Sequence, residues 1–100
     1  MSQDLAQKIE EIITKSAVVV FSKSHCPYCV KAVKTLKEIG REPVVVELDL
    51  VDEGEAQHEY IKKKTGQRTV PAIFIKTKFV GGNSELQALH ADKQLEKMFE

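Results

Sequence analysis

The sequence has only two cysteines, no tryptophan, no net charge and no long apolar run. Cys26 and Cys29 stand three positions apart, so a disulfide between them would close a loop too small to restrain the unfolded chain much. Small secreted domains that rely on disulfides are usually richer in cysteine. We therefore expect the pair to have a chemical rather than a structural role.

The charge balance gives the chain no general affinity for polyanions. Lysine plus arginine and aspartate plus glutamate number 15 each, and a neutral protein is not drawn to nucleic-acid phosphates or anionic lipid. The N-terminus lacks the cationic and apolar segments of a signal peptide, and no run approaches membrane-spanning length. We expect a cytoplasmic monomer with no nucleic-acid or membrane partner.

The size and composition fit one globular domain. The chain has 100 residues, of which 42% are apolar and 30% are charged. This is enough for one modest core and too little for two. There is no repeat, low-complexity tract or linker, so we expect a single domain over residues 1–100.

Apolar spacing predicts the elements of the first half. Apolar residues recur at helical spacing over about residues 1–16, which indicates an amphipathic helix. The β-branched run at 17–21 has the length of a buried strand. A second helix is predicted over 26–40 and a second strand over 44–48. This alternation is typical of a parallel β-α-β unit.

A third helix and a hairpin are predicted next. Asp52 and Glu55 have the spacing of a capping box that opens a helix ending at Thr65–Gly66. Two short apolar runs within 72–80 are close enough for a hairpin. Its turn, Lys76–Thr77, lacks the usual Asn-Gly or Asp-Gly chemistry.

The last helix completes the predicted order of elements. Ser84 and Gln87 have the spacing of another capping box, and a short break is expected near Asp92. The order α-β-α-β-α-β-β-α predicts an α/β fold in which a four-stranded mixed sheet has helices on both faces.

The Cys26–Cys29 segment lies where a buried strand is followed by a helix. Pro27 suits the first helical position because its missing N–H would have no partner there, which places Cys26 at the N-cap. The helix dipole, free backbone N–H groups and nearby Lys23 all favour thiolate over thiol at Cys26. We predict that Cys26 is the nucleophile.

Cys29 lies one helical turn further on and faces the same side. Because it shares an apolar stripe with Val33 and Leu36, we expect it to be the more buried thiol, which resolves mixed disulfides by forming a Cys26–Cys29 disulfide. The alternative to a redox pair is that the two cysteines are inert core residues with no chemical role. A zinc site would need four ligands, and the three histidines stand alone in the sequence, so no metal is expected.

The motifs together resemble those of one family. Cys26-Pro27-Tyr28-Cys29, Thr69-Val70-Pro71 and Gly81-Gly82-Asn83-Ser84 have the order and spacing of dithiol glutaredoxins, and the resemblance covers essentially the whole chain. It implies the thioredoxin fold and a glutathione-dependent oxidoreductase that reduces protein–glutathione mixed disulfides and protein disulfides. Glutathione would be the co-substrate.

The resemblance also implies a glutathione groove. A cis bond before Pro71 would expose the Val70 backbone to the cysteine of glutathione, and the helix that starts near Ser84 would receive the γ-glutamyl carboxylate. Glu85 would take the ammonium, and Lys23, Gln67 and Arg68 would meet the glycine carboxylate. The implied groove residues are Lys23, Cys26, Tyr28, Gln67, Arg68, Thr69, Val70, Pro71, Gly82, Asn83, Ser84 and Glu85.

Three positions depart from the family pattern. Glu85 replaces the usual aspartate and either holds the ammonium or only favours the helix dipole. His58 replaces a common glutamine and either contacts the glycine carboxylate or faces water. Ala72 replaces a larger polar residue and is expected to open the rim of the groove.

The Lys62–Lys64 run either is a solvated helix end or steers anionic substrates.

Two other functions fit parts of the sequence. A thioredoxin-like reductase fed by a flavoprotein would share the CxxC motif, but the chain has His25 before Cys26 where thioredoxins usually have tryptophan. An iron-sulfur carrier would bind a cluster between two copies through Cys26 and glutathione. Pro27 argues against the carrier, because cluster-binding relatives more often have a small residue there.

Overall fold

The computed structural model describes residues 3–100 and has the predicted order of elements. Residues 1 and 2 of the first predicted helix lie outside this range. The helices and strands are α1 (Gln3–Lys15), β1 (Val18–Ser22), α2 (Pro27–Glu38), β2 (Val44–Glu47), α3 (Gly54–Thr65), β3 (Ala72–Ile75), β4 (Lys78–Gly81), α4 (Asn83–Ala91) and the 3-10 helix η1 (Glu96–Phe99).

The four strands form one mixed sheet in the order β2-β1-β3-β4. β1 runs parallel to β2 and antiparallel to β3, and β4 runs antiparallel to β3. All side chains of the two central strands are buried, whereas the edge strands are partly exposed. The parallel β1-α2-β2 unit predicted from the sequence is confirmed.

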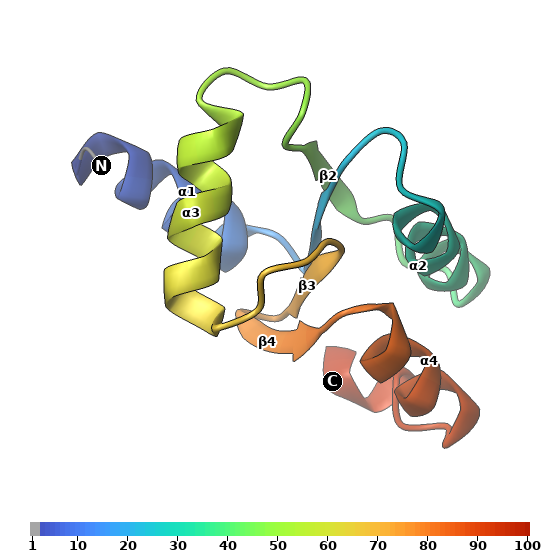
Figure 1. Cartoon of the computed structure of the whole chain (residues 1–100). Helices are drawn as coiled ribbons and strands as arrows, with labels where there is room; N and C mark the ends of the chain where they lie inside the picture. Colours follow the sequence, from blue (N-terminus) through green and yellow to red (C-terminus); the bar gives the residue numbers. More distant parts are fainter. Residues whose placement is uncertain (1–2) are drawn as a thin grey trace.

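Helices cover both faces of the sheet, as predicted (Figure 1). α1 and α3 pack on the face that presents Val19, Phe21 and Phe74. α2 and α4 pack on the opposite face, against Val20 and Ile73. This arrangement is the thioredoxin fold that the sequence resemblance implies. None of the helices in the described range is long and apolar enough to cross a membrane.

The predicted capping box at the start of α3 is wrong. The N-cap is Glu53, which has a left-handed φ of 58° and makes no side-chain capping bond. Gly54 follows it and lies against the backbone of Leu48, where an added β-carbon would come 1.7 Å from the Leu48 carbonyl oxygen. This close approach, rather than an Asp52–Glu55 pair, determines where α3 begins.

The predicted capping box at the start of α4 is also displaced. The helix begins at Asn83 with Gly82 as its N-cap. The backbone N–H of Gly82 donates a 2.6 Å hydrogen bond to Oε1 of Glu85. Gln87 instead donates from its side chain to Asn83 and to Thr35 of α2, so it fixes α4 to α2.

The hairpin and the break after α4 are both as predicted. Lys76 and Thr77 form the two-residue turn between β3 and β4 and have φ angles of 47° and 73°. Both values are left-handed, a conformation that asparagine and glycine usually supply in such turns. α4 ends with Asp92 as its C-cap, and Lys93 has a φ of 59°.

Candidate active site

Cys26 occupies the N-cap of α2. Pro27 is the first residue of the helix, and the backbone N–H of Cys29 donates to the Cys26 sulfur over 3.2 Å. An N-cap side chain normally accepts such a bond through oxygen. Here the acceptor is a half-buried sulfur at the positive end of a helix dipole. The geometry therefore suits a nucleophilic thiolate.

Cys29 lies beneath Cys26 in the protein. Its side chain is buried, with 1% of the residue exposed, and both cysteines are free thiols. Burial, and then the hydrogen bond with Cys26, raise the pKa of Cys29 to about 11, although a hydrogen bond with the Ser22 hydroxyl opposes the shift. Cys29 is therefore the protonated partner, as the sequence predicted.

The backbone of Val70 lies beside the Cys26 sulfur. The Val70–Pro71 peptide bond is cis, as the resemblance implied, and the Val70 carbonyl oxygen is 3.9 Å from Cys26 Sγ. The Gln67 side chain donates to the carbonyl oxygens of Thr69 and Pro71 at 2.9 and 2.8 Å. Gln67 therefore supports this segment, a role that the sequence did not suggest.

Most of the implied groove residues line one hollow of about 570 Å³ next to Cys26. Those that line it are Tyr28, Gln67, Thr69, Val70, Pro71, Gly82, Asn83, Ser84 and Glu85. The first turn of α4 closes one end, where backbone N–H groups can receive an anion. Lys23 and Arg68 do not line the hollow, and Arg68 instead lines a neighbouring one with Lys62 and Lys63.

His58 is half-buried and does not simply face water. Its Nε2 atom is buried and has no hydrogen-bond partner. Burial lowers the pKa of His58, and the nearby ammonium groups of Lys62 and Lys23 lower it further. A backbone hydrogen bond with Arg68 opposes this shift. His58 therefore stands among the cations expected at the glycine end of the groove.

Two further expectations change in the structure. Ala72 was expected to open the rim of the groove, but it is 1% exposed and belongs to the core packed by α1 and α3. In the lysine run, Lys62 pairs with Glu59 at 3.2 Å and Lys64 pairs with Glu10 at 2.9 Å. These two cations therefore serve helix contacts at the surface, while Lys63 remains exposed.

Sequence reasoning missed the role of Asp49 beside the active-site loop. Its carboxylate accepts hydrogen bonds from the Ser24 N–H at 2.9 Å and from the Ser24 hydroxyl at 2.5 Å. These bonds hold the pKa of Asp49 below its ordinary value. The available signal was topological, because the carboxyl ends of parallel β1 and β2 meet at one edge of the sheet.

Within residues 3–100, no three side chains of His, Cys, Asp or Glu gather as metal ligands would. The arrangement near the groove supports the chemistry of two thiols. One sulfur is half-buried beside a groove, and the other is buried one helical turn away.

Comparisons with known proteins agree with this geometry. The family model for glutaredoxin matches residues 18–80. Glutaredoxin-1 of Rhizophagus irregularis is 49% identical over 98% of this chain and 96% of its own length. Glutaredoxin of Ricinus communis is 43% identical over 88% of this chain and 86% of its own length. The crystal structure of the buckwheat glutaredoxin–glutathione complex aligns with a TM-score of 0.93 at 32% identity, covering 99% of this chain and 94% of the buckwheat chain.

Proposed function

The chain belongs to the glutaredoxin family, and we propose that Cys26 and Cys29 carry out its glutathione-dependent reduction of disulfides. The chain is a glutathione-dependent thiol-disulfide oxidoreductase. The observation that carries the residue assignment is the hydrogen bond from the Cys29 N–H to the Cys26 sulfur at the helix N-cap. It supports Cys26 as the attacking sulfur.

Reduction of a protein–glutathione mixed disulfide needs only Cys26. Its thiolate attacks the glutathione sulfur, the bond to the protein sulfur breaks, and the protein thiolate leaves and takes up a proton. Cys26 is then joined to glutathione. A second glutathione thiolate attacks the glutathione sulfur of this intermediate, which releases glutathione disulfide and restores the Cys26 thiolate.

Reduction of a protein disulfide also uses Cys29. Cys26 attacks one sulfur of the substrate disulfide, the bond between the two substrate sulfurs breaks, and the other sulfur leaves as a thiolate. Cys26 and the attacked sulfur are then joined in a mixed disulfide. Cys29 loses its proton and attacks the Cys26 sulfur, so the second substrate thiolate leaves and a Cys26–Cys29 disulfide forms. Two glutathione molecules then reduce that disulfide. The raised pKa of Cys29, about 11, keeps it protonated until Cys26 has reacted.

We propose that glutathione lies along the hollow between Tyr28 and α4. The Val70 backbone would pair with the cysteine residue of glutathione, and the first turn of α4 would bind the γ-glutamyl carboxylate. Glu85 uses Oε1 to accept from Gly82, which leaves its other oxygen for the ammonium. Lys23 and Arg68 would attract the glycine carboxylate from the opposite end. The buckwheat complex supports glutathione as the ligand.

We also propose that the protein acts as a cytoplasmic monomer on glutathionylated and disulfide-containing proteins. The balanced charge of the chain supports the absence of nucleic-acid and membrane partners. Gel filtration of the reduced protein with and without glutathione would test the monomer, since a stable dimer under both conditions would contradict it.

The proposed roles are tested by replacing each cysteine with serine. Cys26→Ser is expected to abolish reduction of both a glutathionylated peptide and a protein disulfide. Cys29→Ser is expected to retain the first activity and lose the second, because the backbone N–H that supports Cys26 remains. Turnover is followed with glutathione, glutathione reductase and NADPH. Equal loss of both activities in the two variants would contradict the assignment.

A further inference from the structure

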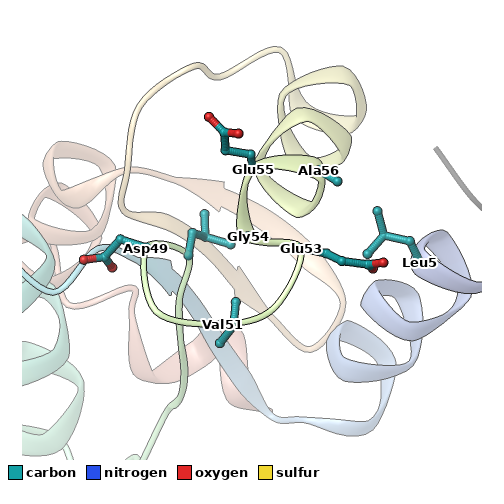
Figure 2. A pocket seen from close by; sticks show the side chains of 8 residues that line it. Leu5, Asp49, Val51, Glu53, Gly54, Glu55 and Ala56 are labelled. Atoms are coloured by element: carbon teal, nitrogen blue, oxygen red, sulfur yellow. The ribbon is translucent and has the colours of Figure 1, made fainter.

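Asp49 is bound to the loop that carries Cys26. It follows β2, and its carboxylate accepts from the Ser24 N–H at 2.9 Å and from the Ser24 hydroxyl at 2.5 Å. Asp49 lines a pocket with Glu53 and Glu55, but its carboxylate points away from both, to the side opposite Leu5 (Figure 2). The side chain therefore serves the active-site loop rather than the pocket.

This contact fixes a short loop at one point. Within the loop, the Cys26 N–H donates to the Lys23 carbonyl oxygen at 3.2 Å. The Asp49–Ser24 bonds anchor that turn to the turn that follows β2. His25 Nδ1 lies 3.6 Å from Asp49 Oδ2, but the His25 side chain is 77% exposed, and such pairs contribute little. Ser24 is thus the main partner of Asp49.

The position of the Cys26 sulfur depends on this loop. Cys26 follows Ser24 by two residues. Its sulfur accepts a hydrogen bond from the Cys29 nitrogen at 3.2 Å, and it must stay in this position to be stabilised by the N-terminus of the helix. We infer that Asp49 is a positioning residue, which holds Ser24 so that the Cys26 sulfur stays at the N-cap of α2. The inference rests on the proposed role of Cys26 as the nucleophile.

Charge and tethering make opposite predictions for Asp49. As a nearby anion, Asp49 disfavours a thiolate, so removing its charge would promote thiolate formation if charge alone mattered. As a tether, it keeps the sulfur where the helix stabilises the thiolate, so its loss would have the reverse effect. The two bonds from Ser24 go to different oxygens of Asp49, and Asp49→Asn replaces one of those oxygens with an NH2 group, which cannot accept a hydrogen bond. The sign of the effect in Asp49→Asn therefore separates the two explanations.

The test compares Asp49→Asn with Ser24→Ala and with a control, Asp52→Asn. Asp52 is an exposed acid in the segment between β2 and α3, which also contains Asp49. Its substitution removes the same charge without touching Ser24. For each variant we would measure the pH profile of Cys26 alkylation by iodoacetamide, together with kcat and KM for a glutathionylated peptide.

Asp49→Asn is expected to move the midpoint of the alkylation profile to higher pH and to lower kcat/KM about tenfold, mainly through kcat. This is the fold-change for losing one hydrogen bond to a charged group. Ser24→Ala is also expected to move the midpoint to higher pH, and it should lower kcat/KM about threefold. The double variant should be no worse than Asp49→Asn, because both substitutions break the same contact. Asp52→Asn should behave as wild type.

An unchanged or lower midpoint in Asp49→Asn would overturn the inference, as would an equal loss in Asp52→Asn. Should Asp49→Asn fail to fold by circular dichroism, Ser24→Ala decides alone, since it keeps every charge. Failure of the proposed function is recognised separately. It would appear as glutathione-dependent activity that survives in Cys26→Ser, whereas the alkylation profile needs no glutathione.

Discussion

The backbone N–H of Cys29 donates to the sulfur of Cys26 across 3.2 Å. Cys29 therefore supports Cys26 in two ways. Its N–H stabilises negative charge on the attacking sulfur, and its buried thiol can later attack that same sulfur. Because the first contribution comes from the backbone, it survives any substitution of the Cys29 side chain other than proline.

The two thiols are expected to differ strongly in reactivity. Burial, and then the hydrogen bond with Cys26, raise the pKa of Cys29 to about 11, so Cys29 stays a thiol over the neutral range. Only thiolates react with iodoacetamide at a useful rate. In neutral solution we expect one label per molecule, at Cys26, with a second label at Cys29 only as the pH approaches its raised pKa of about 11. Peptide mass spectrometry measures this.

The control for this experiment is Cys26→Ser, which should take up no label in neutral solution. Labelling of Cys29 in the wild type at a rate similar to that of Cys26 near pH 8 would contradict the assigned protonation states.

Glu85 is expected to bind glutathione as well as cap α4. Its Oε1 accepts from the Gly82 N–H at 2.6 Å, and an amide oxygen can accept the same bond. Glu85→Gln should therefore change the free energy of unfolding by less than about 1 kcal/mol. It should raise the KM for glutathione about fivefold, because the ammonium loses a charged partner. Steady-state kinetics and urea unfolding measure the two effects.

Glu55→Gln is the matched control, because Glu55 is the acid in the first turn of α3 and lies outside the glutathione groove. It should leave the KM unchanged. If Glu85→Gln also left the KM unchanged while destabilising the protein, Glu85 would be a capping residue only.

The sequence predicted those features that depend on neighbouring residues. Pro27 marks the first turn of α2, so Cys26 could be placed at its N-cap without knowledge of the rest of the fold. The order of helices and strands followed from apolar spacing for the same reason. The burial of Cys29 followed from the apolar stripe that it shares with Leu36.

Features that depend on distant residues were missed. The start of α3 is determined by Gly54 against the Leu48 backbone, and spacing rules could not show that contact. Asp49 meets Ser24 from 25 residues away, through the pairing of β1 with β2. Ala72 was misplaced because only the sheet register shows that its side chain faces the core.

The contact between Gly54 and Leu48 is expected to tolerate no side chain. In Gly54→Ala the new β-carbon would meet a backbone oxygen at 1.7 Å, so α3 or the preceding turn must move. We expect a loss of about 3 kcal/mol or more in the free energy of unfolding, measured by urea denaturation.

Gly66→Ala is the control for Gly54→Ala. Gly66 has a φ of +80° and no atom within 4 Å of an added β-carbon, so its substitution tests the cost of a left-handed backbone alone. That cost is about 1 kcal/mol. Equal losses in the two variants would show that the Leu48 contact is unimportant.

The protein is expected to become more stable when glycine replaces Thr77 in the β3–β4 turn. Thr77 has a φ of 73°, which is unfavourable for a β-branched residue by about 1–2 kcal/mol. The greater freedom of glycine in the unfolded chain offsets part of this, so Thr77→Gly should stabilise the protein by about 0.5–1 kcal/mol and raise Tm by about 2–8 °C. Thr77→Ala keeps the β-carbon and should gain less. Destabilisation by Thr77→Gly, seen in thermal unfolding, would show that the threonine side chain contributes more than its backbone strain costs.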